Sequence, residues 1–207
     1  IVADPRLSVA AGKADEWLGA IPAPWVFPLF LTSAHPAEDR NTGEFFTANY
    51  ANAGAGNPGF THLIRWHKAG ALEHFQIIDE HGDPVVIEQC IHQIALTKNY
   101  VILQDSAFVV EMRQMVFDAA QLLMPGLPIR DLFGGSQMRA QRPTTVLYLV
   151  PRRALRPRSG GHAEEPTQVR AIRVEIPGES VHFFAQYDDS ETLELIIPHT
   201  PTLDVSE

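Results

Sequence analysis

The chain has 207 residues, and its composition of 45% hydrophobic and 20% charged residues is typical of a folded globular protein. A total of 16 Lys and Arg residues against 25 Asp and Glu residues gives a formal net charge of −9, which argues against a general role in binding nucleic acid. The single cysteine, Cys90, excludes an internal disulfide and a zinc site made of cysteines.

The sequence contains no run that approaches the roughly 20 continuous apolar residues of a membrane-spanning helix. The chain begins at Ile1 without a methionine and ends at Glu207 without an evident closing element. We therefore expect it to be part of a longer polypeptide. The low cysteine content fits a reducing compartment, and we expect a cytoplasmic location.

From about residue 43 to residue 105 the pattern is that of short β-strands. Aromatic and β-branched residues favour strands, and clusters of Gly, Asn and Asp separate them. Residues 54–59 match G-x-G-x-x-G, but a strand is predicted after them where a dinucleotide site needs a helix. The predicted strands are residues 44–50, 61–67, 73–79, 84–89, 91–96 and 100–104.

The segment 111–124 is expected to be a helix, because its apolar residues recur at helical spacing and Pro125-Gly126 ends the pattern. A basic, then Gly/Pro-rich loop is predicted at 151–167. Further strands are predicted at residues 145–150, 169–174, 180–187 and 192–197. Short, regularly spaced strands predict an all-β fold, which is a sandwich, a barrel or a propeller.

Three of the nine histidines are candidate metal ligands. His35 precedes a predicted turn and strand, His92 begins a predicted strand, and His182 lies among apolar residues. A neutral imidazole held at a strand end is a good metal ligand. The three are too far apart in sequence for a local motif, so only the fold can assemble them. Taken alone, each is more simply a structural histidine.

The other six histidines are expected to be structural or solvated. His62 and His67 lie five residues apart on one predicted strand and therefore point to opposite faces. Cys90 is expected to be a small buried hydrophobic residue and not a nucleophile. His74, His81 and His162 lie in or beside turns and are expected to be solvated, whereas His199 ends a predicted strand, where it could line a cavity.

Three segments that contain the candidate ligands share a pattern. Residues 34–45 read A-H-P-A-E-D-R-N-T-G-E-F, residues 91–103 read I-H-Q-I-A-L-T-K-N-Y-V-I-L, and residues 181–188 read V-H-F-F-A-Q-Y-D. In this order they resemble the first three histidine segments of the carotenoid cleavage oxygenases, A-H-P with D-x-x-T-G-E, H-D-F-x-x-T-x-x-Y and F-H-x-x-N-A-Y-E. Residues 148–152, Y-L-V-P-R, are similar to the strand of that family that ends in P-R.

The chain departs from the family pattern at several positions. Gln93 stands where Asp is usual, the third segment lacks the usual Asn, and Asp188 stands where Glu is usual. The family uses a fourth histidine in a Gly-rich segment, and no residue here matches it, since His199 follows His182 too closely. The chain is also less than half as long as a full family member.

The resemblance implies a seven-bladed β-propeller with a helical cap segment at about 111–124, of which residues 1–207 are a partial domain. It implies that His35, His92 and His182 hold Fe2+ together with a further histidine. It also implies cleavage of a carbon–carbon double bond of a carotenoid, apocarotenoid or stilbene by O2, with two carbonyl products. The implied partners are this apolar substrate, O2 and the rest of the polypeptide, without nucleic acid.

Phe108, Phe117 and Phe133 are candidates for an apolar substrate tunnel, and core packing is equally open for each of them. The segment 111–124 is expected to pack as a cap on the propeller, with peripheral contact to a membrane as the alternative. Two other interpretations of the chain remain open. The first is a non-catalytic propeller module without a complete metal site. The second is an unrelated β-sandwich enzyme, which the three ordered matches disfavour.

Overall fold

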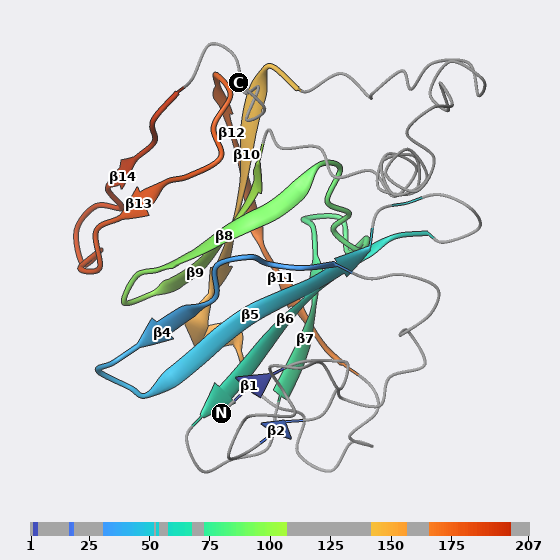
Figure 1. Ribbon diagram of the computed structural model, residues 1–207, viewed down its shortest axis with the longest axis vertical. Helices are drawn as coiled ribbons and strands as arrows, with labels where there is room; N and C mark the ends of the chain where they lie inside the picture. The colour runs from blue at the N-terminus through green and yellow to red at the C-terminus, as the bar shows by residue number, and fades with distance from the viewer. Residues whose placement is uncertain are drawn as a thin grey trace, which may run out of the picture.

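The computed structural model describes residues 2–3, 17–18, 31–51, 53, 58–67, 73–106, 142–156 and 166–199 (Figure 1). The described part is all-β, as predicted, with one short 3-10 turn, η2 (Arg152–Ala154), and without an α-helix in these ranges. Within the same ranges, no helix is long and apolar enough to cross a membrane.

The first sheet combines the early strands with one strand from much later in the chain. Its order is β11-β7-β6-β5-β3, and β4 pairs with β5 beside β3. All neighbours are antiparallel except β11, which lies parallel to β7. The strands are β3 (Leu31–Thr32), β4 (Ala37–Asp39), β5 (Glu44–Ala51), β6 (Phe60–His67), β7 (Glu73–Ile78) and β11 (Thr167–Arg170).

The second sheet has four antiparallel strands in the order β12-β10-β9-β8, which is the strand number and pairing of one propeller blade. No closed ring of sheets is present among the described residues, so the propeller itself stays a prediction. The strands are β8 (Cys90–Leu96), β9 (Tyr100–Ser106), β10 (Thr144–Pro151) and β12 (Ile172–Pro177).

Two small strand pairs accompany these sheets. A parallel pair joins β1 (Val2–Ala3) to β2 (Trp17–Leu18), and an antiparallel pair joins β13 (Phe184–Ala185) to β14 (Leu195–Ile196). Figure 1 shows the β13–β14 pair, in red, apart from the two larger sheets and close to the end of β8 and β9.

The core forms because the strands alternate between two apolar faces. The main core contains residues of both large sheets, such as Phe46 of β5, Phe75 of β7 and Leu103 of β9. The opposite face of the second sheet carries Ile102 and a second core, which also holds Phe183. Burial on both faces of β9 explains why its first four residues, 100–103, read as a continuous apolar run.

The strands predicted at 44–50, 61–67, 73–79, 91–96, 100–104 and 145–150 are confirmed within a residue or two at their ends. The strand predicted at 84–89 is wrong. Only Pro84 forms an isolated bridge, to Ile78, and the backbone N–H groups of residues 88–90 donate to the Asp105 carboxylate instead of a neighbouring strand.

The strands predicted near the C-terminus differ more from the structure. The strand predicted at 169–174 is split at Ala171 into β11 and β12, which join different sheets. The strands predicted at 180–187 and 192–197 shorten to the two-residue strands β13 and β14. The helix predicted at 111–124 and the tunnel candidates Phe108, Phe117 and Phe133 lie outside the described residues.

Candidate metal centre

His92 lies at a β-bulge in β8, where this strand gains one residue relative to β9. Ile91 pairs with Asp105 and Ile94 pairs with Leu103, so His92 and its neighbour stand opposite a single residue. Bulges of this kind re-aim side chains and are frequent beside functional sites. The bulge therefore sets the direction of the His92 ring.

The same stretch of β8 holds His35 in place through its backbone. The His35 N–H donates to the His92 carbonyl at 3.0 Å, and the Ile94 N–H donates to the His35 carbonyl at 3.2 Å. This parallel bridge joins the segment before β4 to the edge of the second sheet. Two candidate ligands separated by a long stretch of sequence thus become neighbours through two main-chain hydrogen bonds.

His182 lies in the irregular segment between β12 and β13. The next residue, Phe183, is buried in the second core, and the Gln93 carboxamide donates to its carbonyl at 2.8 Å. The Ser180 hydroxyl donates to the His182 carbonyl at 2.7 Å, and Gln104 of β9 donates to the Ser180 carbonyl at 3.2 Å. The second sheet thus fixes this segment from both sides of the ligand.

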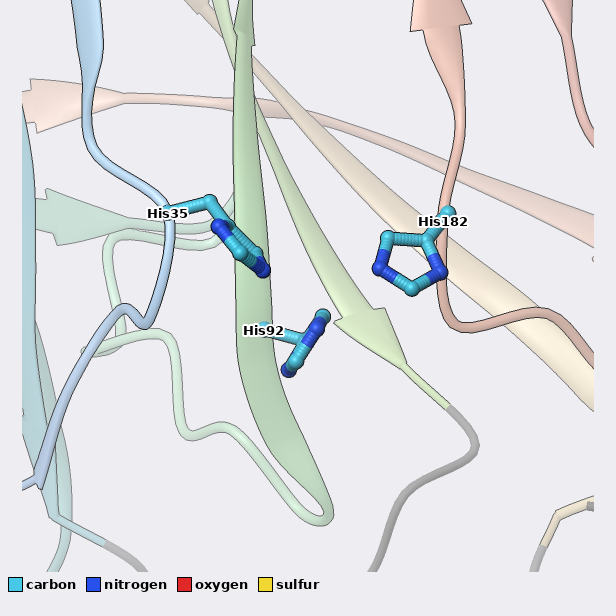
Figure 2. Close-up of side chains that lie close together, drawn as sticks. All are labelled: His35, His92 and His182. Carbon is cyan, nitrogen blue, oxygen red and sulfur yellow. The ribbon is translucent and has the colours of Figure 1, made fainter. Parts of the chain in front are cut away.

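The three imidazole rings meet in one small space (Figure 2). Each of His35, His92 and His182 offers a ring nitrogen, and these nitrogens all lie within 4.8 Å of one another. The ring centroids are 4.7 Å apart for His35 and His92, 4.8 Å for His92 and His182, and 6.0 Å for His35 and His182. The structure therefore brings the three candidate ligands into one cluster, and their role in binding a metal stays a prediction.

The three side chains suit a divalent transition metal. Metal–imidazole bonds of about 2.1 Å place neighbouring ligand atoms roughly 3–3.5 Å apart, and the three nitrogens lie within 4.8 Å of one another. His92 is half-buried while His35 and His182 are exposed, so the cluster has a solvent-facing side. Three protein ligands with remaining open positions are typical of catalytic metal sites, and imidazole suits iron, zinc, copper and nickel alike.

Electrostatics keep the central ligand neutral. Burial is the largest cause that lowers the pKa of His92, and the adjacent His182 and His35 rings lower it further. A neutral imidazole retains the lone pair that a metal ion needs. At neutral pH the half-buried ring is therefore ready to bind a cation without first losing a proton.

Several of the non-histidine residues of the shared segments form an ionic cluster, which we call the Arg152 cluster. Arg152, just after β10, contacts the carboxylates of Asp39, at 2.6 Å, and Glu44. The Tyr187 hydroxyl donates to Asp39 at 2.9 Å, and Arg152 also donates to the Thr97 carbonyl at 2.9 Å. Arg152 thus joins the first histidine segment, through Asp39 and Glu44, to Thr97 of the second histidine segment. The bond between Tyr187 and Asp39 joins the third histidine segment to the first.

Opposing effects act on the carboxylates of the Arg152 cluster. Burial raises the pKa of Asp39 and of Glu44, but the hydrogen bonds from Arg152 and the other donors outweigh it and lower both pKa values. For Arg152 the same contacts outweigh burial and raise the pKa of the guanidinium. The cluster is therefore fully ionised at neutral pH.

The D-x-x-T-G-E residues owe their spacing to the tight turn between β4 and β5. Asp39 accepts the Asn41 N–H on its side chain at 2.9 Å and the Gly43 N–H on its carbonyl at 2.7 Å. Gly43 has a φ of 74°, which favours glycine. The turn places Glu44 at the start of β5, where Arg65 of β6 lies 3.1 Å away and Arg152 also reaches it.

The histidines outside the cluster have other surroundings. His62 and His67 face opposite sides of β6, as predicted, because the pairing with β5 runs without a register shift between them. The expectation that His74 is solvated is wrong, because its side chain is only 8% exposed and its ring lies beside that of buried His62, with 6.1 Å between the ring centroids. His199 packs over Gly178, His81 is exposed, and His162 lies outside the described residues.

Residue-by-residue reasoning missed the groups that hold the ligands in place. The roles of Gln93, Asp39 and Tyr187 follow from contacts between segments that are distant in sequence. The only indication in the sequence was that Asp39 and Tyr187 match the family segments, whereas Gln93 departs from them. The strand prediction after residues 54–59 is confirmed by β6, which leaves no helix for a dinucleotide there.

Comparison with known proteins adds one match. A family model described as retinal pigment epithelial membrane protein matches residues 10–205, a range that contains all three histidine segments and the Arg152 cluster. No curated protein matches the chain.

Proposed function

The chain belongs to the family of the carotenoid cleavage oxygenases and the retinal pigment epithelial membrane protein, and we propose on that premise that it forms part of a non-haem Fe2+ dioxygenase. Members of this family are mostly oxygenases and isomerases. The proposed reaction adds the two atoms of O2 across one carbon–carbon double bond and breaks that bond, giving two carbonyl products. The proposed substrate is a carotenoid, an apocarotenoid or a stilbene.

The observation that carries this proposal is the convergence of His35, His92 and His182 from three segments that are distant in sequence. These residues would hold the iron through their ring nitrogens, with at least one position left for another ligand. Bound iron would supply the activation of O2. The chain itself directs the three imidazoles at one point, through the bulge of β8 and the contacts around it.

The rest of the proposed protein follows the family pattern. A fourth histidine would come from the part of the polypeptide beyond this chain, and residues 1–207 would be a portion of a propeller with a cap near 111–124. Phe108, Phe117 and Phe133 remain candidates for the apolar tunnel, since a conjugated substrate needs apolar walls. A cytoplasmic location, with the cap segment as a candidate peripheral membrane contact, completes the proposal.

The test begins with the intact mass of the denatured purified protein, which shows how much polypeptide accompanies this chain. Iron is then quantified, and the protein is incubated with a polyene and with a stilbene in the presence of O2. We expect bound iron and two carbonyl products per double bond cleaved. Iron binding without cleavage of either substrate class would favour a binding module.

Replacement of one ligand tests the metal site directly. His92→Ala removes the half-buried central ligand, and we expect it to abolish iron binding while the circular dichroism of the strands persists. His81→Ala is the matched control, because His81 lies on an exposed turn away from the cluster. Full metal retention by His92→Ala would remove His92 from the site.

A further inference from the structure

Gln93 follows His92 in the bulge of β8 and contacts the segment that carries His182. We propose that Gln93 is a positioning residue, which sets His182 in the metal centre by pairing its carboxamide with the backbone of Phe183. The inference rests on the proposed metal site, and it assigns a role to a position where the usual family residue is Asp.

The contact is a two-point hydrogen bond. The Gln93 Nε2 donates to the Phe183 carbonyl at 2.8 Å, and the Phe183 N–H donates to the Gln93 Oε1 at 3.4 Å. A carboxamide carries a donating NH2 group and an accepting oxygen, so it can pair with both backbone groups of a single residue. The side chain thereby acts on Phe183 as a neighbouring strand would.

His182 depends on this contact because it lies outside regular structure. The described strand nearest to His182 along the chain is β13. It begins at Phe184 and has only two residues, which pair with β14. The Phe183 side chain, at 3% exposure, fixes how deeply this segment sits in the second core. Burial of a ring is non-directional, whereas two hydrogen bonds from β8 fix where the backbone lies along that strand.

The bulge explains how two consecutive residues of β8 reach the same segment. In a regular strand the side chains of His92 and Gln93 would point to opposite faces. In the bulge the His92 ring lies 4.8 Å from the His182 ring, and Gln93 bonds the next residue. One irregularity in β8 therefore positions one ligand directly and a second ligand through Gln93.

An Asp at this position could not do the same work. An ionised carboxylate has only acceptors, so it cannot donate to the Phe183 carbonyl. Its side chain is also one methylene shorter. The proposed role therefore depends on the carboxamide and on its length, which makes it accessible to substitution.

The test measures binding of Co2+ to the purified full-length protein, with the visible absorption of the bound ion as a report on its ligands. Gln93→Met keeps the length of the side chain and adds no charge, but it removes both hydrogen bonds. We expect Co2+ affinity to fall by about 10–100-fold, the range found when residues that orient metal ligands are replaced. We also expect the absorption spectrum to change, because His182 is no longer held in place.

Gln168→Met on β11 is the matched control. Gln168 is exposed, and its carboxamide bonds Gln76 at 3.2 Å, so the same chemical change is made away from the histidines. This variant should keep wild-type affinity and spectrum. Affinity within twofold of wild type and an unchanged spectrum in folded Gln93→Met would overturn the proposal.

Two further outcomes separate this inference from the proposed function. Failure of the wild-type protein to bind Co2+ would overturn the metal site and the inference with it, whereas a wild-type site that Gln93→Met leaves intact overturns the inference alone. If Gln93→Met does not fold, Gln93→Glu, which has the same length and keeps the acceptor, undergoes the same spectral test. Failure of both variants to fold would assign Gln93 to the fold instead of the site.

Discussion

Replacement of Arg152 by Met is expected to destabilise the protein strongly. The change keeps an unbranched apolar stem but removes the cation that compensates two carboxylates. Glu44 retains Arg65 at 3.1 Å, so the loss falls mainly on Asp39, whose side chain is fully buried. Among the described residues, Asp39 would then keep the Tyr187 hydroxyl and the turn amides as partners.

The magnitude follows from the burial of the Arg152 cluster. Removing one partner of a buried ion pair costs about 3–5 kcal/mol, because an uncompensated charge stays in the interior. The Arg152 and Glu44 side chains are 10% and 15% exposed, which places the expected loss near the lower end, at about 3 kcal/mol. Urea unfolding followed by circular dichroism measures this difference at pH 7.

The pH dependence identifies the cause. The folded-state pKa values of Asp39 and Glu44 are lowered, so their contribution to stability is present above the ordinary carboxyl pKa and is lost as the pH falls through the folded values. In Arg152→Met, burial without the cation raises the pKa of Asp39, and protonation relieves the penalty. The difference between variant and wild type should therefore shrink from pH 7 to pH 4.

The control is Arg173→Met, which breaks an exposed pair with Glu175, at 46% and 43% side-chain exposure. An exposed pair is worth at most about 1 kcal/mol, so this variant should lie close to the wild type. A loss below about 1 kcal/mol for Arg152→Met, or a loss equal at pH 7 and pH 4, would refute the reasoning.

Two further predictions concern two buried side chains, His62 of the first sheet and Cys90 of the second sheet. Burial, and then the nearby His74, lower the pKa of His62 from 6.5 to about 4, so its contribution to stability is complete above pH 6.5 and is lost as the pH falls toward 4. Urea unfolding between pH 7 and pH 4 should show about 3 kcal/mol less pH dependence in His62→Leu than in wild type, and equal slopes would contradict this. Burial also raises the pKa of the Cys90 thiol, which accepts a hydrogen bond from the Tyr50 hydroxyl at 3.2 Å. A thiol-reactive dye should therefore label Cys90 only in urea, and rapid labelling of the folded protein would show that the thiol is accessible.

The sequence predicted strands well where local patterning decides the structure. β9 and β10 are buried on both faces, so each contains a continuous apolar run, at residues 100–103 and 146–150, which indicates a strand from local sequence alone. Prediction failed at 84–89, because those amides find their acceptor in the side chain of Asp105, which a local pattern cannot show. It failed at His74 because the pairing of β6 with β7 places this ring beside the buried ring of His62, a contact that the turn residues near His74 do not indicate.

The candidate site could be predicted in part. The histidine types and the shared segments pointed to His35, His92 and His182, although their spacing alone gave no reason to group them. The contacts that hold them depend on a register shift in β8 and on a side chain that replaces a strand partner. No local sequence pattern around Gln93 or Tyr187 indicates such a role.

The parallel contact of β11 with β7 has a consequence for how the protein folds. The chain passes from β11 through Ala171 directly into β12, and the Ala171 N–H donates to the Ile78 carbonyl at 2.9 Å. The edge strand of the first sheet, β11, is thus continuous in the chain with the edge strand of the second sheet, β12. Contacts between such distant parts of a chain raise the contact order, which slows folding because a large loop must close first. Because Ala171 alone separates β11 from β12, the edge of the first sheet and the edge of the second sheet cannot move independently of each other.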